Sequence, residues 1–470
     1  MLFNSLPFLA FIAIFFGIWP LVRNKNTWRW LWICCMSMVF YGWWDWRFLF
    51  LLFFTGAIDY LSGKFILKFP SQKKFWLWLS LATNIGSLVI FKYSGWLASL
   101  LDSGFGLLNM HTELKNAIPE FTLVLPVGIS FYTFNSMSYT IDLYRGKTKP
   151  AENILHFFAF ISFFPHLVAG PIIRAKDILT QLTKPIHTNT VQIFNGIRIC
   201  VWGLFQKMVL ADNIAVLVND QFNQVGEHSD TAQWWLCMLA FAFQIYFDFN
   251  GYSTIARGIA KLCGIHFRLN FSHPYFANSF QNFWQRWHIS LSSFFRDYVY
   301  ISLGGNRKGK LRTNINLWIT MLLSGIWHGA NFTFVIWGAL HALYLSIERV
   351  IVKQNIIIHN KQFKAIINSL MVFIPVLVAW TFFRAKDMHE ALYIVKCLFS
   401  FHFELGIKEL LISNAVFWLF IGIINDFILF KRIKLIRTNA PVFQAILISF
   451  IIAIIIFFRG PEQQFIYFQF

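Results

Sequence analysis

Charged residues are scarce in this chain. Asp, Glu, Lys and Arg together make up 13% of its 470 residues, against roughly 25% in a typical soluble domain. Acidic residues are the scarcer kind, with 21 Asp and Glu beside 40 Lys and Arg, whereas apolar residues reach 57%. So little charge excludes a soluble globular protein and predicts an integral membrane protein.

Cysteine is also scarce, and its spacing excludes two kinds of site. Two of the six cysteines are adjacent within an apolar run, and the other four are far apart along the chain: Cys34, Cys35, Cys200, Cys237, Cys263 and Cys397. This spacing fits neither a disulfide framework nor a set of metal ligands. We expect reduced cysteines that serve as packing residues, and no bound metal.

Several signatures of other protein classes are missing. The sequence shows no internal repeat, no low-complexity tract, no P-loop and no dinucleotide-binding fingerprint. Because no polar linker separates the apolar runs, we expect one membrane domain over residues 1–470, without a second globular module such as a serine hydrolase. Residues 1–23 lack a positive leader and a small-residue cleavage site, so they predict a retained first span.

The net charge of +19 has two explanations. In a soluble protein it would suggest nucleic-acid binding. In a membrane protein, cations collect in cytoplasmic loops and beside anionic lipid headgroups. The apolar composition favours the second explanation, so we expect contact with membrane lipid and not with nucleic acid. Some cations could still bind a polyanionic cofactor on the cytoplasmic side.

Apolar runs of about 20 residues can cross a bilayer, and their number predicts an all-α polytopic protein with about 11–12 transmembrane helices. The run 315–347 is long enough for two short crossings or for a broken pair of helices that meets near His328. Residues 154–173 are interrupted by Pro165 and Gly170-Pro171, which predicts a re-entrant segment. The other runs are residues 6–22, 28–43, 48–67, 75–101, 121–143, 191–218, 234–256, 366–383, 410–430 and 442–458.

Loop charge orients these spans. Lys and Arg concentrate in the first, third and fifth loops, so the positive-inside rule predicts an outward N-terminus. Residues 220–230 carry no Lys or Arg and are expected outside, whereas residues 257–312 are strongly basic and are expected inside. The C-terminus is then expected outside. Residues 271–305 mix aromatic with polar side chains, which predicts amphipathic or re-entrant helices that line a cytoplasmic cavity.

Two histidines flank a short basic loop. His288 lies in QNFWQRWHISLS and His328 lies in LLSGIWHGANF. Imidazole exchanges a proton near neutral pH without a large perturbation of its pKa, and a polar residue at membrane depth is a candidate for function. A buried histidine can equally serve only in packing, so burial alone leaves both interpretations open.

Four long motifs carry a resemblance to a known family. In chain order they are LPVGISFYTFNSMSYTIDLYRG, FAFQIYFDFNGYSTIARGIAKL, SHPYFANSFQNFWQRWHISLSSFFRDYVYISLGGNRKG and SGIWHGANFTFVIWGALHALYLSIER. Over nearly the whole chain it resembles the membrane-bound O-acyltransferase family, in the branch typified by bacterial alginate O-acetyltransferase. The resemblance implies transmembrane helices ringed around re-entrant helices, with a tunnel from a cytoplasmic donor pocket to an outward acceptor site. It also implies a multi-pass protein of the bacterial cytoplasmic (inner) membrane.

The resemblance implies roles for both histidines, within a catalytic core at about residues 240–350. The family's catalytic histidine falls on His328 and its second active-site position on His288. Acetyl transfer to a hydroxyl needs a base, which typically contributes roughly 10² to 10⁴ in rate, and we assign this role to His328. His288 could stabilise the oxyanion, hold the acceptor or only support the site. Asn331 could orient the ring or bind a carbonyl, or instead cap a helix turn.

The acyl donor implied by the resemblance is acetyl-CoA, whose phosphates need cations on the cytoplasmic side. Arg pairs well with phosphate, but anchoring to lipid headgroups explains the same charges equally well. The turn at Gly304-Gly305-Asn306 permits a tight bend without the spacing of a phosphate-binding loop. The candidate cations are Arg286, Arg296, Arg307 and Lys308, with Lys310 and Arg312 beside them.

Two further features are candidates for supporting roles. Asp248, in IYFDFNGYS, places an acid within an apolar run, where it could line the tunnel or pair with Arg257; we favour structural support. Residues 465–470, FIYFQF, resemble an aromatic C-terminal motif of extracytoplasmic acylation systems, in which a tyrosine hydroxyl is proposed to carry the acyl group. Tyr467 would then receive acetyl and hand it to a partner enzyme. The alternative is an aromatic anchor at the membrane interface.

The leading hypothesis is a membrane O-acetyltransferase. It would use cytoplasmic acetyl-CoA for O-acetylation of an exported polysaccharide, with alginate favoured over peptidoglycan or cellulose, and an extracytoplasmic acetyltransferase partner would complete the transfer. One alternative is a lipid-linked glycan transporter or export scaffold, since many spans around a tunnel suit transport too. Another keeps the family and changes the chemistry to D-alanyl transfer to teichoic acid.

Overall fold

The computed structural model is built from helices throughout. It describes residues 1–110, 112–168, 170–186, 188–227, 229–351, 361–403, 407–431 and 441–468, and these residues form no β-strand. They divide into two compact units, one made of Met1–Cys200 with Ser253–Arg268 and the other of Val201–Tyr252 with Leu269–Phe470. The predicted all-α architecture is therefore confirmed, whereas the tunnel and the single domain stay predictions.

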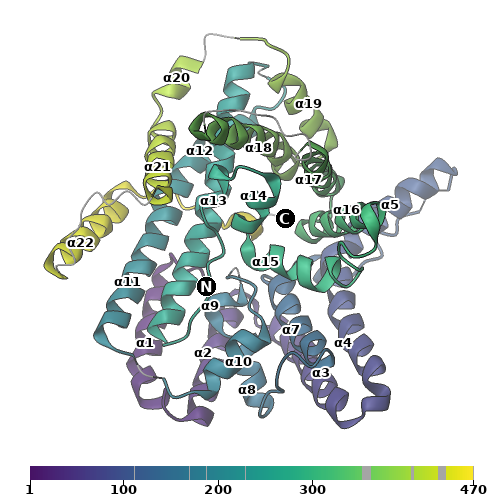
Figure 1. Cartoon of the computed structure of the whole chain (residues 1–470), viewed down its shortest axis with the longest axis vertical. Coiled ribbons are helices and arrows are strands. Elements are labelled where there is room, and N and C mark those ends of the chain that lie inside the picture. The colour runs from purple at the N-terminus through teal and green to yellow at the C-terminus, as the bar shows by residue number, and fades with distance from the viewer. Residues whose placement is uncertain are drawn as a thin grey trace. The chain divides into compact units, whose positions relative to one another are not determined.

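The first unit holds the N-terminal helices. Within it α3 packs against α4 and α7, and α2 packs against α8 (Figure 1). Its elements are α1 (Leu6–Val22), α2 (Asn26–Asp45), α3 (Phe48–Lys68), η1 (Pro70–Gln72), α4 (Lys73–Leu88), η2 (Val89–Tyr93), α5 (Ser94–Leu107), α6 (Glu120–Leu123), α7 (Ile129–Tyr144), α8 (Ile154–Ile161), α9 (Phe164–Leu167), α10 (Ala175–Thr183) and most of α11 (Thr190–Leu204).

Two predicted segments of this unit have different outcomes. The single span expected over residues 121–143 is wrong, because residues 124–128 break it into α6 and the buried helix α7. Pro126 lies in that break, where it removes a backbone donor. The apolar residues 154–173 are interrupted as expected: they form the short buried helices α8 and α9, and Pro165 lies at the start of α9.

The second unit carries both histidines. Within it α17 packs against α16 and α18, and α12 packs against α21 (Figure 1). Its elements are η3 (Phe205–Ala211), α12 (Asp212–Asn223), most of α13 (Thr231–Leu262), η4 (Pro274–Phe276), α14 (Phe280–Arg286), α15 (Ile289–Phe294), η5 (Phe295–Tyr300), α16 (Gly309–His328), α17 (Phe332–Ile351), α18 (Lys361–Arg384), α19 (Met388–Leu398), α20 (Ile407–Leu411), α21 (Asn414–Phe430), α22 (Pro441–Phe458) and η6 (Ile466–Phe468).

Several helices have the length and composition of membrane spans. Among the described residues five qualify: Phe48–Lys68, Pro70–Leu107, Thr190–Asn223, Phe332–Ile351 and Lys364–Arg384. Three shorter apolar helices accompany them, at Leu6–Val22, Asn414–Phe430 and Val442–Phe458. A polytopic membrane protein is confirmed, and the larger number of about 11–12 crossings predicted from the apolar runs stays a prediction.

Two local features of the second unit position the histidines. The apolar run 315–347 is broken as expected, because α16 ends at His328 and α17 begins at Phe332. The region 271–305 forms the short helices α14, α15 and η5. Ser279 begins α14, since its hydroxyl accepts a hydrogen bond from the Asn282 amide at 2.9 Å.

Candidate active site

His328 is the last residue of α16, and its side chain is buried in an aromatic cage. Its ring centroid lies 5.0 Å from that of Trp327, 4.9 Å from Trp337 and 5.1 Å from Phe383. The partial negative charge at a helix C-terminus stabilises a cation there. A proton taken up by this imidazole would therefore gain support from α16.

His288 is fully buried at the turn that precedes α15. Its φ of 41° puts it in the left-handed region, which a residue with a side chain rarely occupies. Strained backbone of this kind persists where the surrounding structure fixes it, and it is frequent at functional sites. The turn therefore sets the direction of the His288 ring, and its left-handed backbone is less stable than a right-handed one.

A hydrogen bond to Asn270 decides the protonation pattern of His288. The Asn270 side-chain oxygen accepts from the backbone N–H of Ser290 at 3.1 Å, which identifies this atom as the oxygen. The same oxygen lies 3.3 Å from His288 Nδ1, so Nδ1 donates to it. In the neutral ring the lone pair then lies on Nε2. Burial lowers the pKa of His288 to about 3, which keeps this ring neutral at physiological pH.

Tyr467 joins the two histidines into one cluster. Its ring centroid lies 5.7 Å from that of His328 and 6.3 Å from that of His288. The hydroxyl is buried, and burial raises its pKa well above the usual value, so the phenol is protonated at neutral pH. A phenol in this state needs a base before it can act as a nucleophile. Gln469 and Phe470, the last residues of the predicted motif, lie outside the described residues.

Asn331 caps a helix. Its side-chain oxygen accepts from the Thr333 backbone N–H at 3.1 Å, one residue after the start of α17, and its amide donates to the Lys386 carbonyl at 2.8 Å. The contact with Thr333 matches the capping interpretation of the sequence. It also fixes the beginning of α17, directly after the turn that follows His328.

Asp248 lies on α13 and contacts the chain next to Tyr467. Its carboxylate forms an ion pair with Lys207 at 2.8 Å, whereas the sequence offers Arg257 as a possible partner. The second oxygen accepts from the Ile466 backbone N–H at 2.8 Å. Sequence reasoning missed Lys207, although a lysine within an apolar run is itself a signal of a paired, functional charge.

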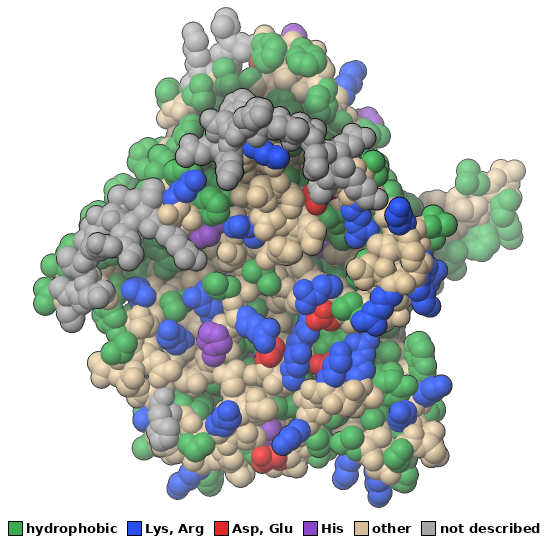
Figure 2. Space-filling view, viewed as in Figure 1, with side chains coloured by type: hydrophobic (Ala, Val, Ile, Leu, Met, Phe, Trp, Pro, Cys, Tyr) green, Lys and Arg blue, Asp and Glu red, His purple; other side chains and the backbone are tan. Residues whose placement is uncertain are grey.

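The predicted donor-binding cations lie in two environments. Arg286 donates to the Asn282 side chain at 2.8 Å and to the Ser272 carbonyl, and Arg296 pairs with Asp297 at 2.7 Å. Arg307 and Lys308 are exposed beside Lys310 and Arg312 at the start of α16. Figure 2 shows Lys and Arg side chains on the face presented by α15 and the start of α16. Exposed cations suit a polyanion better than cations already held by protein groups.

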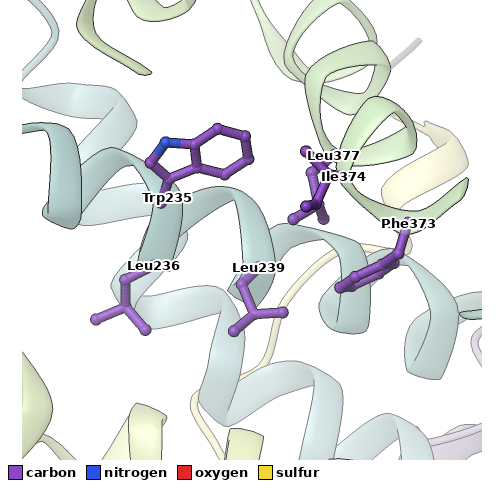
Figure 3. A pocket seen from close by; sticks show the side chains of 6 residues that line it. All are labelled: Trp235, Leu236, Leu239, Phe373, Ile374 and Leu377. Carbon is purple, nitrogen blue, oxygen red and sulfur yellow. The ribbon is translucent and has the colours of Figure 1, made fainter. Parts of the chain in front are cut away.

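An apolar hollow of about 390 Å³ lies between α13 and α18 (Figure 3). Its polar group is the Trp235 indole N–H, which donates to the Leu398 carbonyl at 2.9 Å. A site for acyl transfer needs polar groups at the reacting atoms. The residues that line the hollow are apolar and do not belong to the histidine cluster. It is lined by Trp235, Leu236, Leu239, Phe373, Ile374 and Leu377.

The aromatic cage extends to a third histidine that sequence reasoning missed. His341, on α17, is fully buried, and its ring centroid lies 4.8 Å from that of Trp337, which also contacts His328. It follows His328 in the motif HGANFTFVIWGALHALYL, so the pattern alone could have indicated it. His341 thus packs on Trp337, which forms one wall of the cage.

Comparison with known proteins identifies the family of this chain. The model of the MBOAT, membrane-bound O-acyltransferase family matches residues 148–386, which include both histidines and the cage residues on α16, α17 and α18. A probable alginate O-acetylase of Pseudomonas putida is 39% identical over 413 residues, or 85% of this chain and 81% of that protein. This chain belongs to the membrane-bound O-acyltransferase family.

Two further relatives of this O-acyltransferase differ in the polymer they are named for. The peptidoglycan O-acetyltransferase of Helicobacter pylori is 34% identical over 84% of this chain and 79% of that protein. The teichoic acid D-alanyltransferase of Bacillus subtilis is 28% identical over 50% of this chain and 62% of that protein. The O-acyltransferase therefore has relatives named for O-acetylation over most of its length, and relatives named for D-alanylation over about half.

The resemblance read from four motifs is thus confirmed, and the chain is an acyltransferase. Its buried cluster brings together a neutral imidazole, a second imidazole at a helix C-terminus and a phenol. Imidazole can take the proton of an attacking hydroxyl, and a second polar group can stabilise the developing oxyanion.

Proposed function

We propose that this O-acyltransferase moves acetyl groups from cytoplasmic acetyl-CoA toward an exported polysaccharide, in a bacterial inner membrane. The names of its relatives support acetyl as the acyl group, since both the alginate and the peptidoglycan enzymes are named for O-acetylation. The higher identity to the alginate O-acetylases supports an alginate-like acceptor.

In this proposal His328 is the general base and Tyr467 the first acceptor. His328 removes the Tyr467 phenol proton while the phenol oxygen attacks the thioester carbonyl. The new C–O bond forms as the C–S bond breaks, and the thiolate leaves as the free thiol with the proton from the imidazole. His288, whose ring centroid lies 6.3 Å from that of Tyr467, holds the phenol ring in place beside His328.

One observation carries this proposal. The ring of Tyr467 lies 5.7 Å from the His328 ring at the end of α16 and 6.3 Å from the His288 ring at the turn before α15, and all three side chains are buried. Residues so far apart in sequence meet only if the fold brings them together, and proximity and orientation are a major part of catalysis.

The remaining parts of the proposal concern donor and partner. The exposed cations Arg307 and Lys308, with Arg286 and Arg296 nearby in sequence, would hold the phosphates of acetyl-CoA on the cytoplasmic side. The acetylated Tyr467 would pass its acetyl to an extracytoplasmic acetyltransferase, which modifies the polymer. No metal takes part in this scheme.

The test is the variant His328→Ala in cells that make the polymer. We expect polymer acetylation to fall by about 10² to 10⁴, because the general base is lost, while the amount of protein in the membrane is unchanged. His389→Ala, which removes an exposed histidine of α19, is the matched control. Normal acetylation in His328→Ala cells would remove the proposal.

A further inference from the structure

The C-terminal segment (residues 459–468) is anchored at a buried charge cluster. Lys207, in the π-helical turn η3, lies between Asp212 and Asp248, with Nζ to carboxylate distances of 2.9 and 2.8 Å. All three side chains are at most 4% exposed. Charges so deeply buried are stable only when paired and fully hydrogen-bonded.

The C-terminal segment completes the bonding of this cluster. An ammonium group has three donors. Two of the Lys207 donors go to the carboxylates, and the third goes to the Gln463 carbonyl at 3.1 Å. On the opposite side of the ion pair, Asp248 accepts from the Ile466 N–H at 2.8 Å. The ion pair therefore holds one carbonyl and one N–H of the segment, three residues apart.

Further contacts fix the beginning of the segment. The Gly460 N–H donates to the Met208 carbonyl at 2.8 Å, and Asn213 donates to the Phe458 carbonyl at 2.9 Å. A side-chain carbon on Gly460 would lie 2.5 Å from the Asn213 backbone nitrogen, so only glycine permits this approach. The segment runs from here to η6, where the Tyr467 ring contacts His328 at the end of α16.

The hydrogen bonds between the ion pair and the C-terminal segment end at Ile466, one residue before Tyr467. Ile466 is buried, and its N–H is the last backbone group of the segment held by Asp248. Tyr467 then lies with its ring centroid 4.5 Å from that of Phe249, the residue that follows Asp248 on α13. Asp248 and Phe249 are neighbours on α13. The bond from Asp248 to Ile466 and the ring contact of Phe249 with Tyr467 therefore set the direction of the tyrosine side chain together.

We propose that Lys207 and Asp248 are positioning residues, which hold the C-terminal segment so that Tyr467 reaches His328 and His288. This inference rests on the proposed function, in which Tyr467 is the acyl acceptor. It goes further because it assigns a role to a buried ion pair that contacts neither histidine ring in the contacts described above. The bonds from Lys207 and Asp248 hold the C-terminal segment in the site without a long packed helix.

The first experiment measures the position of the segment without using activity. Hydrogen exchange of the full-length protein in lipid nanodiscs reports on the amides of residues 459–468. In Asp248→Asn we expect their exchange to rise at least about tenfold, because a neutral amide accepts less strongly than a carboxylate and turns donors toward Lys207. Asp426→Asn is the matched control, since Asp426 is equally buried and bonds Tyr246 and His273 instead.

The second experiment changes the segment and leaves the buried helices intact. Ile466→Pro removes the N–H that Asp248 accepts, and Ile466→Ala keeps this N–H while also losing the apolar side chain. We expect kcat for acetyl transfer to fall at least about tenfold in the proline variant relative to the alanine variant, with KM for acetyl-CoA unchanged.

The outcomes separate this inference from the proposed function. Unchanged exchange in Asp248→Asn, or equal kcat in the two Ile466 variants, would overturn the positioning role even if Tyr467→Phe is inactive. An active Tyr467→Phe enzyme would instead overturn the acceptor role of the tyrosine. Faster exchange together with a loss of kcat supports the inference, and size-exclusion elution like that of the parent protein shows that the variants are folded.

Discussion

At the scale of single residues, the two imidazoles of the cluster differ in what fixes them. His288 is fixed by the Asn270 oxygen, which leaves its Nε2 as the basic atom. His328 is fixed by a cage of Trp327, Trp337 and Phe383 at the end of α16. One ring is thus set by a hydrogen bond and the other by packing. This difference suits a pair in which one ring orients and the other exchanges a proton.

The phenol of Tyr467 gives the first prediction at this scale. Tyr467→Phe keeps the ring contacts with Phe249 and His328 but removes the hydroxyl. We expect polymer acetylation to fall at least about 100-fold with unchanged protein in the membrane, because the acceptor atom is gone. Tyr344→Phe, which removes a hydroxyl on α17, is the control. An acetyl content equal to that of the parent would end the carrier role.

The depressed pKa of His288 gives the second prediction. Its pKa is about 3 in the folded protein and about 6.5 in an unfolded chain, so between these values the unfolded state binds more protons. The stabilisation from this group is therefore complete above pH 6.5 and is lost as the pH falls. At pH 5 the loss is about 2 kcal/mol.

The measurement is thermal unfolding in detergent at pH 7 and pH 5. In His288→Asn, chosen because asparagine tolerates left-handed backbone, we expect the decrease in Tm between the two pH values to be smaller than in the parent protein. A decrease of the same size would show that His288 is not held neutral by burial.

At the scale of elements, the break between α16 and α17 is the decisive local structure. α16 ends at His328, Gly329 is extended, and Asn331 caps α17. A side-chain carbon on Gly329 would lie 2.1 Å from the Phe334 ring, and Phe334 packs on Phe383 of the cage. Glycine is thus required here for close approach and not for backbone freedom.

Gly329→Ala tests this break. Displacement of Phe334 is expected to cost about 1–3 kcal/mol of stability and to lower acetyl transfer, because the Phe383 wall of the cage moves with it. Gly86→Ala is the control, since open space surrounds Gly86 within α4 and its stability should be unchanged or slightly higher. Equal Tm values and equal activities of the two variants would contradict the prediction.

At the scale of the whole molecule, one compact unit brings together residues from the middle and the C-terminal part of the chain. Residues 201–252 and 269–468 form the unit that holds both histidines, the ion pair and Tyr467. Family membership identifies an acyltransferase. An export scaffold would use the same apolar helices. The two functions differ in whether deletion of the gene removes the acetyl groups or the export of the polymer.

Deletion of the gene gives the prediction at this scale. We expect the secreted polymer to be made in the same amount as in the parent strain but to contain no O-acetyl groups, as measured by NMR of the purified polysaccharide. Restoration by the parent sequence and not by His328→Ala assigns the loss to the chemistry. A failure to export the polymer, with normal acetyl content in what remains, would favour a glycan transporter.

By itself the sequence determined the membrane class, the helical fold, the two histidines and the family, because apolar run length and contiguous motifs are local properties. It also offered a break near His328, since the apolar run 315–347 is long enough for two helices. The interruption at residues 124–128 was missed, although Pro126 marks it in the sequence. The sequence could not determine that Asp248 pairs with Lys207, because this outcome depends on which helices meet.

Only the tertiary structure decided the composition of the site. Asn270 and Trp337 are ordinary residues in the sequence, and they gain their roles from the side chains that the fold places beside them. Tyr467 lies 139 positions after His328, yet their rings are neighbours. A linear pattern records the kind of each side chain, whereas hydrogen bonds and ion pairs depend on distances between helices, which are set when the apolar faces pack.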